Sequence, residues 1–251
     1  MHGLLVLVGD NIIMHRALKE AQKAVSSQEW EMCFSQEKRM TGSAFTGDEE
    51  FDRLGYKVIR NVCDPKLLIT PVPPIKTGQL RYTDTGEEYL ANPLEKQVKG
   101  SVARYTYPPY KEPYNIVQKN IEKSIGQPLY KTYYYDRFYF PGQDLKLHSD
   151  RPPCEISITV HVSTNLKDEF PVYIKTVDGD VSAVNLQSGD GMVYKGCERP
   201  HWRLKMPGVK RNKVRKLLGK DELYYHQAFF HYVLANGHRS HHAGDEIHDW
   251  L

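Results

Sequence analysis

The chain has 251 residues, of which 40% are hydrophobic and 26% are charged, and its formal net charge is +3. This length suffices for one large domain with a substantial core, and the composition is that of a globular protein rather than a disordered or fibrous one. The net charge is too small to indicate nucleic-acid binding by itself. Four cysteines without a CxxC pair argue against a zinc ribbon or a disulfide-stapled domain and favour a reduced, intracellular protein.

No segment of the sequence reaches the roughly 18 apolar residues that a membrane span needs. The N-terminal apolar run, Leu4 to Val8, is too short for a signal peptide, lacks a basic lead and is soon followed by Asp10. The sequence therefore predicts a cytoplasmic protein without a membrane partner.

The first third of the chain has few regular patterns. Residues 1–52 are typical of an accessory segment, in which Ala17 to Val25 is a short run of good helix formers. Apolar residues between Tyr56 and Val62 indicate a strand. The stretch from Ile75 to Asn92 is rich in Thr, Gly and charge, which predicts a long loop or weak strands.

Farther along the chain, one helix and then several strands are expected. Apolar residues recur at helical spacing from Tyr114 to Ile125, which predicts an amphipathic helix that ends at Gly126. Apolar and polar residues alternate from Glu155 to Val162, which predicts a half-buried strand. Four other segments are also β-prone: Tyr130–Phe140, Phe170–Val177, Met192–Tyr194 and Phe229–Leu234. Short strands at close intervals, with helix mostly upstream, predict a mainly β, α+β protein built as a sandwich or jelly roll.

The sequence His148-Ser149-Asp150 places an imidazole and a carboxylate two residues apart. In an extended backbone both side chains face the same way and can reach one metal ion. A third ligand from another strand would complete a face of two histidines and one carboxylate, which suits non-haem Fe(II) because positions stay open for a cosubstrate and O₂. An HxD pair occurs easily by chance, but this pair directly precedes the clearest strand. His201, which lies two or three strands later, is the candidate third ligand.

Four blocks of the sequence resemble the core of the Fe(II)/2-oxoglutarate dioxygenases, most closely the prolyl-4-hydroxylase-like branch. In chain order they are PGQDLKLHSDRPPCEISITVHV, FPVYI, LQSGDGMVYKGCERPHWR and HQAFFHYVLANG, and they fall between Tyr130 and Gly237. The resemblance implies a double-stranded β-helix (jelly roll, cupin-like) domain over residues 53–237, supported by N-terminal helices. It also implies that His148, Asp150 and His201 are the ligands of Fe(II).

The resemblance further suggests which residues bind 2-oxoglutarate. Tyr139, nine residues before His148, matches a tyrosine that hydrogen-bonds this cosubstrate in related prolyl hydroxylases. The far carboxylate of the cosubstrate needs a buried cation, for which a guanidinium is the best match. Arg203 is favoured because on a strand it would share a face with His201. The more distant spacing usual in prolyl hydroxylases points instead to Arg211, so both residues stay candidates.

The implied reaction couples oxidative decarboxylation of 2-oxoglutarate to succinate and CO₂ with insertion of one oxygen atom of O₂ into a substrate C–H bond. Ascorbate is an additional candidate cofactor. The resemblance suggests a prolyl residue of a protein or peptide as the substrate. Residues 203–220 hold eight Lys or Arg and no acid, so a loop that clamps a polyanion, and with it oxidation of a nucleic-acid base, stays open. The alternative for this basic stretch is a solvated loop without a binding role. The alternative for the metal site is a non-oxidative, cupin-like module that binds a metal or a small molecule.

Other polar residues of these blocks have structural interpretations. Arg151 is expected either near the substrate or in an ion pair with Glu155 or Glu198. His231 lies inside an apolar strand and is expected to be a structural histidine. The His-rich segment 238–251 is expected to be a polar, solvated tail rather than a metal site.

Overall fold

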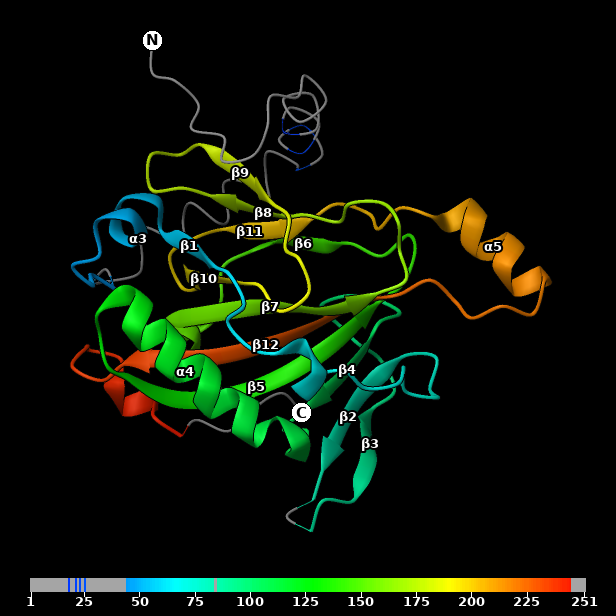
Figure 1. Ribbon diagram of the computed structural model, residues 1–251, viewed down its shortest axis with the longest axis horizontal. Helices are drawn as coiled ribbons and strands as arrows, with labels where there is room; N and C mark the ends of the chain where they lie inside the picture. The colour runs from blue at the N-terminus through cyan, green and yellow to red at the C-terminus, as the bar shows by residue number, and fades with distance from the viewer. Residues whose placement is uncertain are drawn as a thin grey trace.

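The computed structural model describes residues 44–83 and 85–244, together with Leu18, Ala21, Lys23 and Val25. Most of the predicted accessory segment therefore lies outside the described residues, as does the end of the predicted tail. Two sheets form separate layers (Figure 1). In spatial order, the strands of the larger sheet are β1 (Tyr56–Ile59), β10 (Gly191–Lys195), β7 (Ile156–Thr164), β12 (Tyr225–Leu234), β5 (Leu129–Tyr139), β4 (Val102–Tyr105), β2 (Gly78–Tyr82) and β3 (Glu88–Asn92). Those of the smaller sheet are β6 (Leu145–His148), β11 (His201–Arg203), β8 (Val172–Lys175) and β9 (Val181–Val184).

Three α-helices and four short 3₁₀ turns accompany the sheets among the described residues from 44 to 244. The α-helices are α3 (Glu49–Leu54), α4 (Lys111–Ile125) and α5 (Val209–Leu217). The 3₁₀ turns are η1 (Pro65–Leu67), η2 (Pro108–Tyr110), η3 (Pro152–Cys154) and η4 (Ser240–His242). Among the residues described, no helix is long and apolar enough to cross a membrane.

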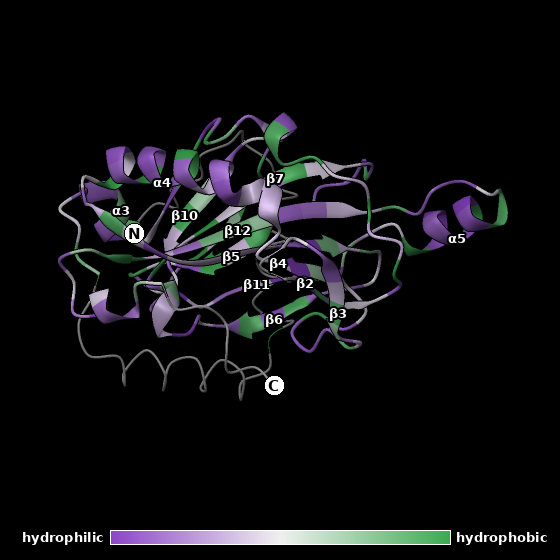
Figure 2. Ribbon diagram, turned by 90° about the horizontal axis from the view of Figure 1, so that it is seen from below, coloured by the Kyte–Doolittle hydropathy of each residue, from purple (hydrophilic) through white to green (hydrophobic). Residues whose placement is uncertain are grey.

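Helix α4 covers the outer face of the larger sheet. Its buried residues Val117, Ile121 and Ile125 join the main core cluster with apolar residues of β7 and β12, and its outer side is hydrophilic (Figure 2). The helix ends as predicted, at Gly126 with φ 71°, a left-handed conformation that glycine adopts without steric cost. It begins at Lys111 rather than Tyr114, because η2 leads directly into it.

Strand β7 differs from the prediction of a half-buried strand. Its apolar residues, such as Ile158, pack in the core beneath α4. Its polar residues Ser157, Thr159 and His161 are buried as well. The reason is that they face the interior between the two sheets, where Thr159 lines a pocket together with residues of the smaller sheet. Alternation in the sequence identified the two faces of the strand but not that a second layer covers the polar one.

Two other regions were left open or misjudged in the sequence. Of the two alternatives for the stretch from Ile75 to Asn92, a long loop or weak strands, the structure shows strands: the hairpin of β2 and β3, which extends one edge of the larger sheet. The basic stretch 203–220 is not simply a loop, because nine of its residues form helix α5. This helix has no internal Gly or Pro and is rich in Lys and Arg, which are good helix formers.

Candidate metal centre and cosubstrate pocket

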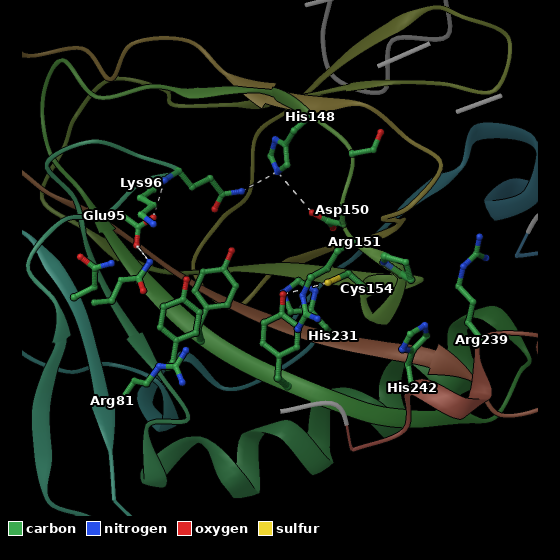
Figure 3. Close-up of a pocket in the computed structure, with 18 of the residues that line it drawn as sticks. Arg81, Glu95, Lys96, His148, Asp150, Arg151, Cys154, His231, Arg239 and His242 are labelled. Atoms are coloured by element: carbon green, nitrogen blue, oxygen red, sulfur yellow. Dashed lines mark hydrogen bonds and ion pairs between the residues drawn. The ribbon is translucent and has the colours of Figure 1, made fainter. Parts of the chain in front are cut away.

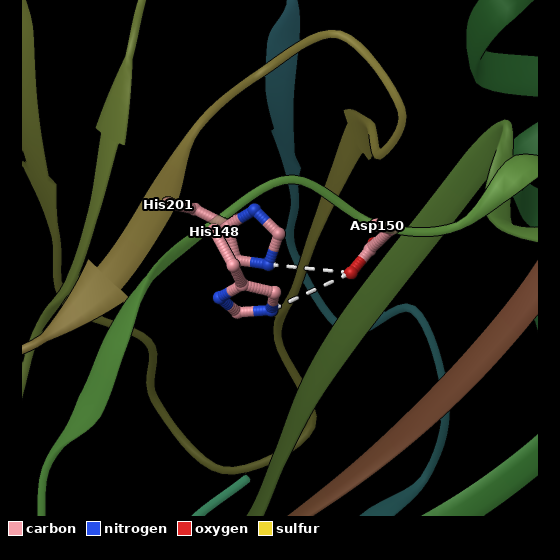
Figure 4. A group of neighbouring side chains, drawn as sticks. All are labelled: His148, Asp150 and His201. Carbon is pink, nitrogen blue, oxygen red and sulfur yellow. Dashed lines mark ion pairs between the residues drawn. The ribbon is translucent and has the colours of Figure 1, made fainter. Parts of the chain in front are cut away.

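The side chains of His148, Asp150 and His201 come together in one cluster. Of these three residues, His148 and Asp150 line the edge of a large cavity (Figure 3). His148 ends β6 and pairs directly with His201, the first residue of β11, so their imidazole rings lie 4.3 Å apart. The Nε2 atoms of His148 and His201 are 3.6 and 3.7 Å from Oδ1 of Asp150. Figure 4 marks these two contacts with dashed lines. Two imidazoles and one carboxylate therefore converge on one point, which is the donor set that suits Fe(II) with open coordination positions.

The second nitrogen of each imidazole is held by the backbone. Nδ1 of His148 lies 2.8 Å from the carbonyl oxygen of Lys146, and Nδ1 of His201 lies 3.0 Å from that of Arg199. In this arrangement Nδ1 carries the proton and Nε2 presents its lone pair to a metal. Burial lowers the pKa of both histidines to about 4, so both are neutral at physiological pH and available as ligands.

Asp150 is oriented by its second carboxylate oxygen. Ser157 Oγ donates to Oδ2 at 2.9 Å, which leaves Oδ1 facing the histidines. The backbone N–H of Asp150 donates to the carbonyl oxygen of Gly196 at 2.9 Å. Burial raises the pKa of Asp150, and the neighbouring His148 opposes that rise. A divalent cation at this point would favour the ionised carboxylate.

Gly196 fits against this carboxylate only because it has no side chain. A Cβ at Gly196 would overlap the carbonyl oxygen of Cys154 and would lie 2.6 Å from both Oδ2 of Asp150 and Oγ of Ser157. We expect Gly196→Ala to displace Asp150, to lower retained Fe(II) roughly tenfold, as loss of a ligand's supporting contact does, and to destabilise the fold by about 1–3 kcal/mol. Metal analysis after dialysis and thermal unfolding measure the two effects.

Gly219→Ala is the matched control for this prediction. Gly219, unlike Gly196, has a left-handed backbone (φ 64°), and a Cβ there would meet nothing within 4 Å. It should therefore show a backbone cost without loss of metal. If Gly196→Ala retains as much Fe(II) as the wild type, the close packing around Asp150 does not matter for the metal.

A small pocket continues from the three candidate ligands into the space between the sheets. It contains both favoured cosubstrate residues, Tyr139 and Arg203. Tyr139 is fully buried, and its hydroxyl has no hydrogen-bond partner in the described structure. Arg203 is buried too, donates to the carbonyl oxygen of Phe170, and lies over the rings of Tyr139 (5.8 Å) and Tyr225 (5.1 Å). A buried cation beside an unsatisfied donor fits a carboxylate ligand.

Arg211, the other candidate, is located elsewhere. It lies on α5 and forms an ion pair with Asp168 at 2.6 Å, in which both side chains are at least 40% exposed. It does not line the pocket that contains Arg203.

Two pocket residues carried no signal in the sequence. Arg137 of β5 is completely buried and donates to Gln97 (2.8 Å) and to Glu95 (3.3 Å). Nε2 of Gln97 lies 3.0 Å from Nε2 of His148, the atom that would bind the metal. The side chain of Gln97 would therefore have to move away from His148 for this atom to bind a metal. The segment before β4 reaches the centre only through the tertiary fold, so local patterns could not identify it.

The large cavity has a volume of about 860 Å³ and begins at His148 and Asp150. Tyr105 and Tyr135 stack on its wall with ring centroids 4.9 Å apart. Arg151 lines the cavity and lies 4.6 Å from the ring of Tyr133. Its basic and histidine lining also includes Arg81, Lys96, His231, His238, Arg239, His241 and His242.

The lining changes three expectations. The described part of the predicted solvated tail contributes His238, His241 and His242 to the cavity wall. Glu155, considered as a partner of Arg151, forms its ion pair with Arg239 at 3.1 Å. His231 is buried as expected of a structural histidine, yet it lines the cavity and its Nε2 has no partner among the described residues.

No family model and no curated protein matches the sequence. Among solved structures, a prolyl hydroxylase from Trichoplax adhaerens, in complex with a hypoxia inducible factor oxygen degradation domain peptide fragment, is 11% identical with a TM-score of 0.51, over 81% of this chain and 92% of that one. A Pseudomonas putida prolyl-4-hydroxylase is 13% identical with a TM-score of 0.47, and the match covers 73% of this chain and 96% of that one. HygX from Streptomyces hygroscopicus, with nickel and 2-oxoglutarate bound, is 12% identical with a TM-score of 0.45, and the match covers 74% of this chain and 85% of that one. The expected fold is thus confirmed: the chain has the double-stranded β-helix fold found in the Fe(II)/2-oxoglutarate-dependent oxygenases.

Proposed function

We propose that the protein is a hydroxylase that depends on Fe(II) and 2-oxoglutarate. The observation that carries this proposal is the convergence of His148, Asp150 and His201 beside a buried pocket that contains Tyr139 and Arg203. A non-oxidative metal-binding module would need the three ligands but not the buried guanidinium and the unpartnered hydroxyl next to them. Both groups are costly to bury without a ligand.

His148, Asp150 and His201 would hold the iron. Bound iron would chelate 2-oxoglutarate and activate O₂ for insertion of one oxygen atom into a substrate C–H bond. Arg203 would bind the far carboxylate of 2-oxoglutarate, and the Tyr139 hydroxyl would donate a hydrogen bond to 2-oxoglutarate. The sequence suggested ascorbate as an additional cofactor, and that suggestion stays a prediction.

A prolyl residue of a protein or peptide is our proposed substrate. The Trichoplax adhaerens prolyl hydroxylase is described in complex with a peptide fragment, and the resemblance in the sequence points to the same class. The cavity beside His148 has room for several residues, and the stacked rings of Tyr105 and Tyr135 offer an apolar wall to a pyrrolidine ring. Oxidation of a nucleic-acid base is the second candidate, because these same rings lie in one cavity with Arg81 and Arg151.

Anaerobic titration with Fe(II) and 2-oxoglutarate tests the proposal. We expect the weak visible absorption band of a chelated iron–2-oxoglutarate complex in the wild type and none in His148→Ala. If iron binds without the band, the cosubstrate assignment is wrong and the non-oxidative module becomes the better interpretation. If the band forms, succinate release stimulated by a prolyl peptide or by a single-stranded oligonucleotide decides between the two substrates.

Substitution of each candidate arginine identifies the cosubstrate anchor. We expect Arg203→Met to raise the KM for 2-oxoglutarate roughly 100-fold, because a buried charge-assisted pair contributes about 2–4 kcal/mol. Arg211→Met should change it less than about twofold, since this guanidinium is in an exposed ion pair. Succinate formation at varied 2-oxoglutarate concentration gives both values. The reverse result would make Arg211 the anchor.

A further inference from the structure

Helix α5 turns its polar residues toward the protein. Asn212 is its one buried residue; its side-chain oxygen accepts from the backbone N–H of Leu223, and its side-chain nitrogen donates to Glu222, both at 2.8 Å. Arg211 pairs with Asp168 on the same side. The helix is thus attached mainly through hydrogen bonds and ion pairs, and of its apolar residues Val209, at its start, lies close to Gly142.

The opposite side of α5 carries the apolar residues. At 100° per residue, six side chains share this half of the helix and of its last turn. We call them the α5 outer face: Val209, Lys210, Lys213, Val214, Leu217 and Leu218. Val214, Leu217 and Leu218 are 55%, 86% and 65% exposed. Figure 1 shows that α5 projects beyond both sheets, and its far end is hydrophobic in Figure 2.

This orientation is the reverse of the usual one. A helix on the surface of a globular protein packs its apolar side inward and exposes its polar side. Contiguous apolar side chains left in water indicate a surface that another body covers. The acidic partners of the helix, Asp168 and Glu222, lie on its inner side, so the outer face is both apolar and positively charged. Exposed Lys205 and Lys220 extend that charge on either side of the helix.

We propose that the α5 outer face docks on the surface of an anionic phospholipid bilayer. Leu217 and Leu218 at the projecting end, with Val214, would enter the boundary between headgroups and acyl chains, and Lys210 and Lys213 would remain among the phosphates. A nucleic acid would satisfy the lysines but would leave the leucines in water. A fluid bilayer also accepts a projecting helix end without a preformed groove.

Peripheral docking is compatible with the absence of a spanning helix among the described residues. The lack of a segment that can cross a bilayer predicted a protein without a membrane partner, but attachment through a basic, apolar helix needs no such segment. The inference uses no residue of the metal centre or its pocket. It therefore stands or fails independently of the proposed function.

Co-sedimentation of the full chain with vesicles tests the inference. We expect binding to vesicles of phosphatidylcholine with about one third phosphatidylserine, little binding to pure phosphatidylcholine, and weaker binding as salt rises. Lys210→Gln/Lys213→Gln should lower the partition coefficient roughly 30-fold, since each basic residue near such a surface contributes about a fivefold factor. Leu217→Gln/Leu218→Gln, which leaves the charge unchanged, should lower it at least about tenfold.

Matched variants elsewhere on the surface control for charge and hydrophobicity. Lys119→Gln/Lys123→Gln removes two exposed lysines from α4, and Leu94→Gln removes a leucine that is 63% exposed. Both should bind anionic vesicles like the wild type. Absence of wild-type binding, or equal loss in these controls, overturns the inference. Sensitivity to the lysine pair but not to the leucine pair overturns it as well, because α5 would then be a general polyanion site.

Discussion

Asp150→Ala is expected to lower turnover of 2-oxoglutarate by a factor of about 10³ or more, and the variant should no longer retain Fe(II). Asp150 supplies the single carboxylate of the ligand set, and without it two neutral imidazoles offer the cation no negative charge. Ser157→Ala should have a smaller effect, about tenfold on metal affinity, because it removes the hydrogen bond that orients Oδ2 but none of the three proposed ligands. Succinate formation and metal content after dialysis measure the two effects.

The thermal stability of metal-free Asp150→Ala shows whether the variant has lost only the metal or also the fold. Burial raises the pKa of Asp150, which means that the ionised carboxylate is unfavourable in the metal-free protein. Metal-free Asp150→Ala should therefore unfold at the same temperature as the metal-free wild type or at a higher one. Asp144→Ala is the control, since Asp144 lies next to β6 and forms a solvent-accessible ion pair with Lys146. Full activity in Asp150→Ala would contradict the assignment of the metal centre.

The proposed metal ligands could be identified in the sequence because their signal is local. The two-residue spacing of His148 and Asp150 needs only an extended backbone, and the strand-rich texture around His201 indicated a second strand. Which positions in the two strands are paired was not predictable. The direct pairing of His148 with His201 depends on how β6 and β11 meet in the smaller sheet.

The residues of the proposed cosubstrate pocket were predictable only in part. Tyr139 and Arg203 were candidates from the resemblance, and they share one pocket. Arg137 and Gln97 had no signal, because a cationic residue in a β-prone run is ordinarily placed at the surface. Arg137 is buried because Glu95 and Gln97 reach it from the segment before β4, a contact that depends on the tertiary fold.

Helix α5 was also predictable only in part. Its basic composition was evident from the sequence, and the stretch was expected to be a loop. The side on which its leucines lie could not be predicted, because the helix is oriented by the hydrogen bonds of Asn212 to Glu222 and Leu223. A hydrophobic pattern alone would have placed Leu217 and Leu218 against the protein.

Asp136→Asn is expected to lower the free energy of unfolding by about 3–5 kcal/mol at pH 7. Asp136 lies on β5, is completely buried, and accepts hydrogen bonds from Arg104 of β4, from His226 of β12 at 2.8 Å and from the hydroxyl of Tyr110 at 2.9 Å. Burial alone would raise its pKa, but Arg104 and His226 outweigh that effect and hold the pKa at about 2. The substitution would leave the buried guanidinium of Arg104 without its counter-ion. Urea unfolding at pH 7 measures the loss.

The pH dependence follows from the lowered pKa of Asp136. A carboxylate whose pKa is lower in the folded state stabilises the protein above its unfolded value, about 3.9, and this contribution is lost as pH falls toward about 2. The difference between wild type and Asp136→Asn should therefore be constant from about pH 5 to 8 and should shrink below about pH 4. Asp168→Asn, which breaks an exposed pair, should cost less than about 1 kcal/mol.

A second substitution distinguishes an ionic network from simple packing at Asp136. If the cost arises from an uncompensated charge, removing that charge as well should restore stability, because buried ion pairs are often replaceable by apolar groups of similar volume. We therefore expect Arg104→Met/Asp136→Asn to be more stable than Asp136→Asn alone. If the double variant is the less stable of the two, the loss comes from the packing and hydrogen bonds that join β4, β5 and β12 rather than from charge. The contribution of Asp136 to the stability of these three strands would then come from how well its side chain packs and hydrogen-bonds with its neighbours.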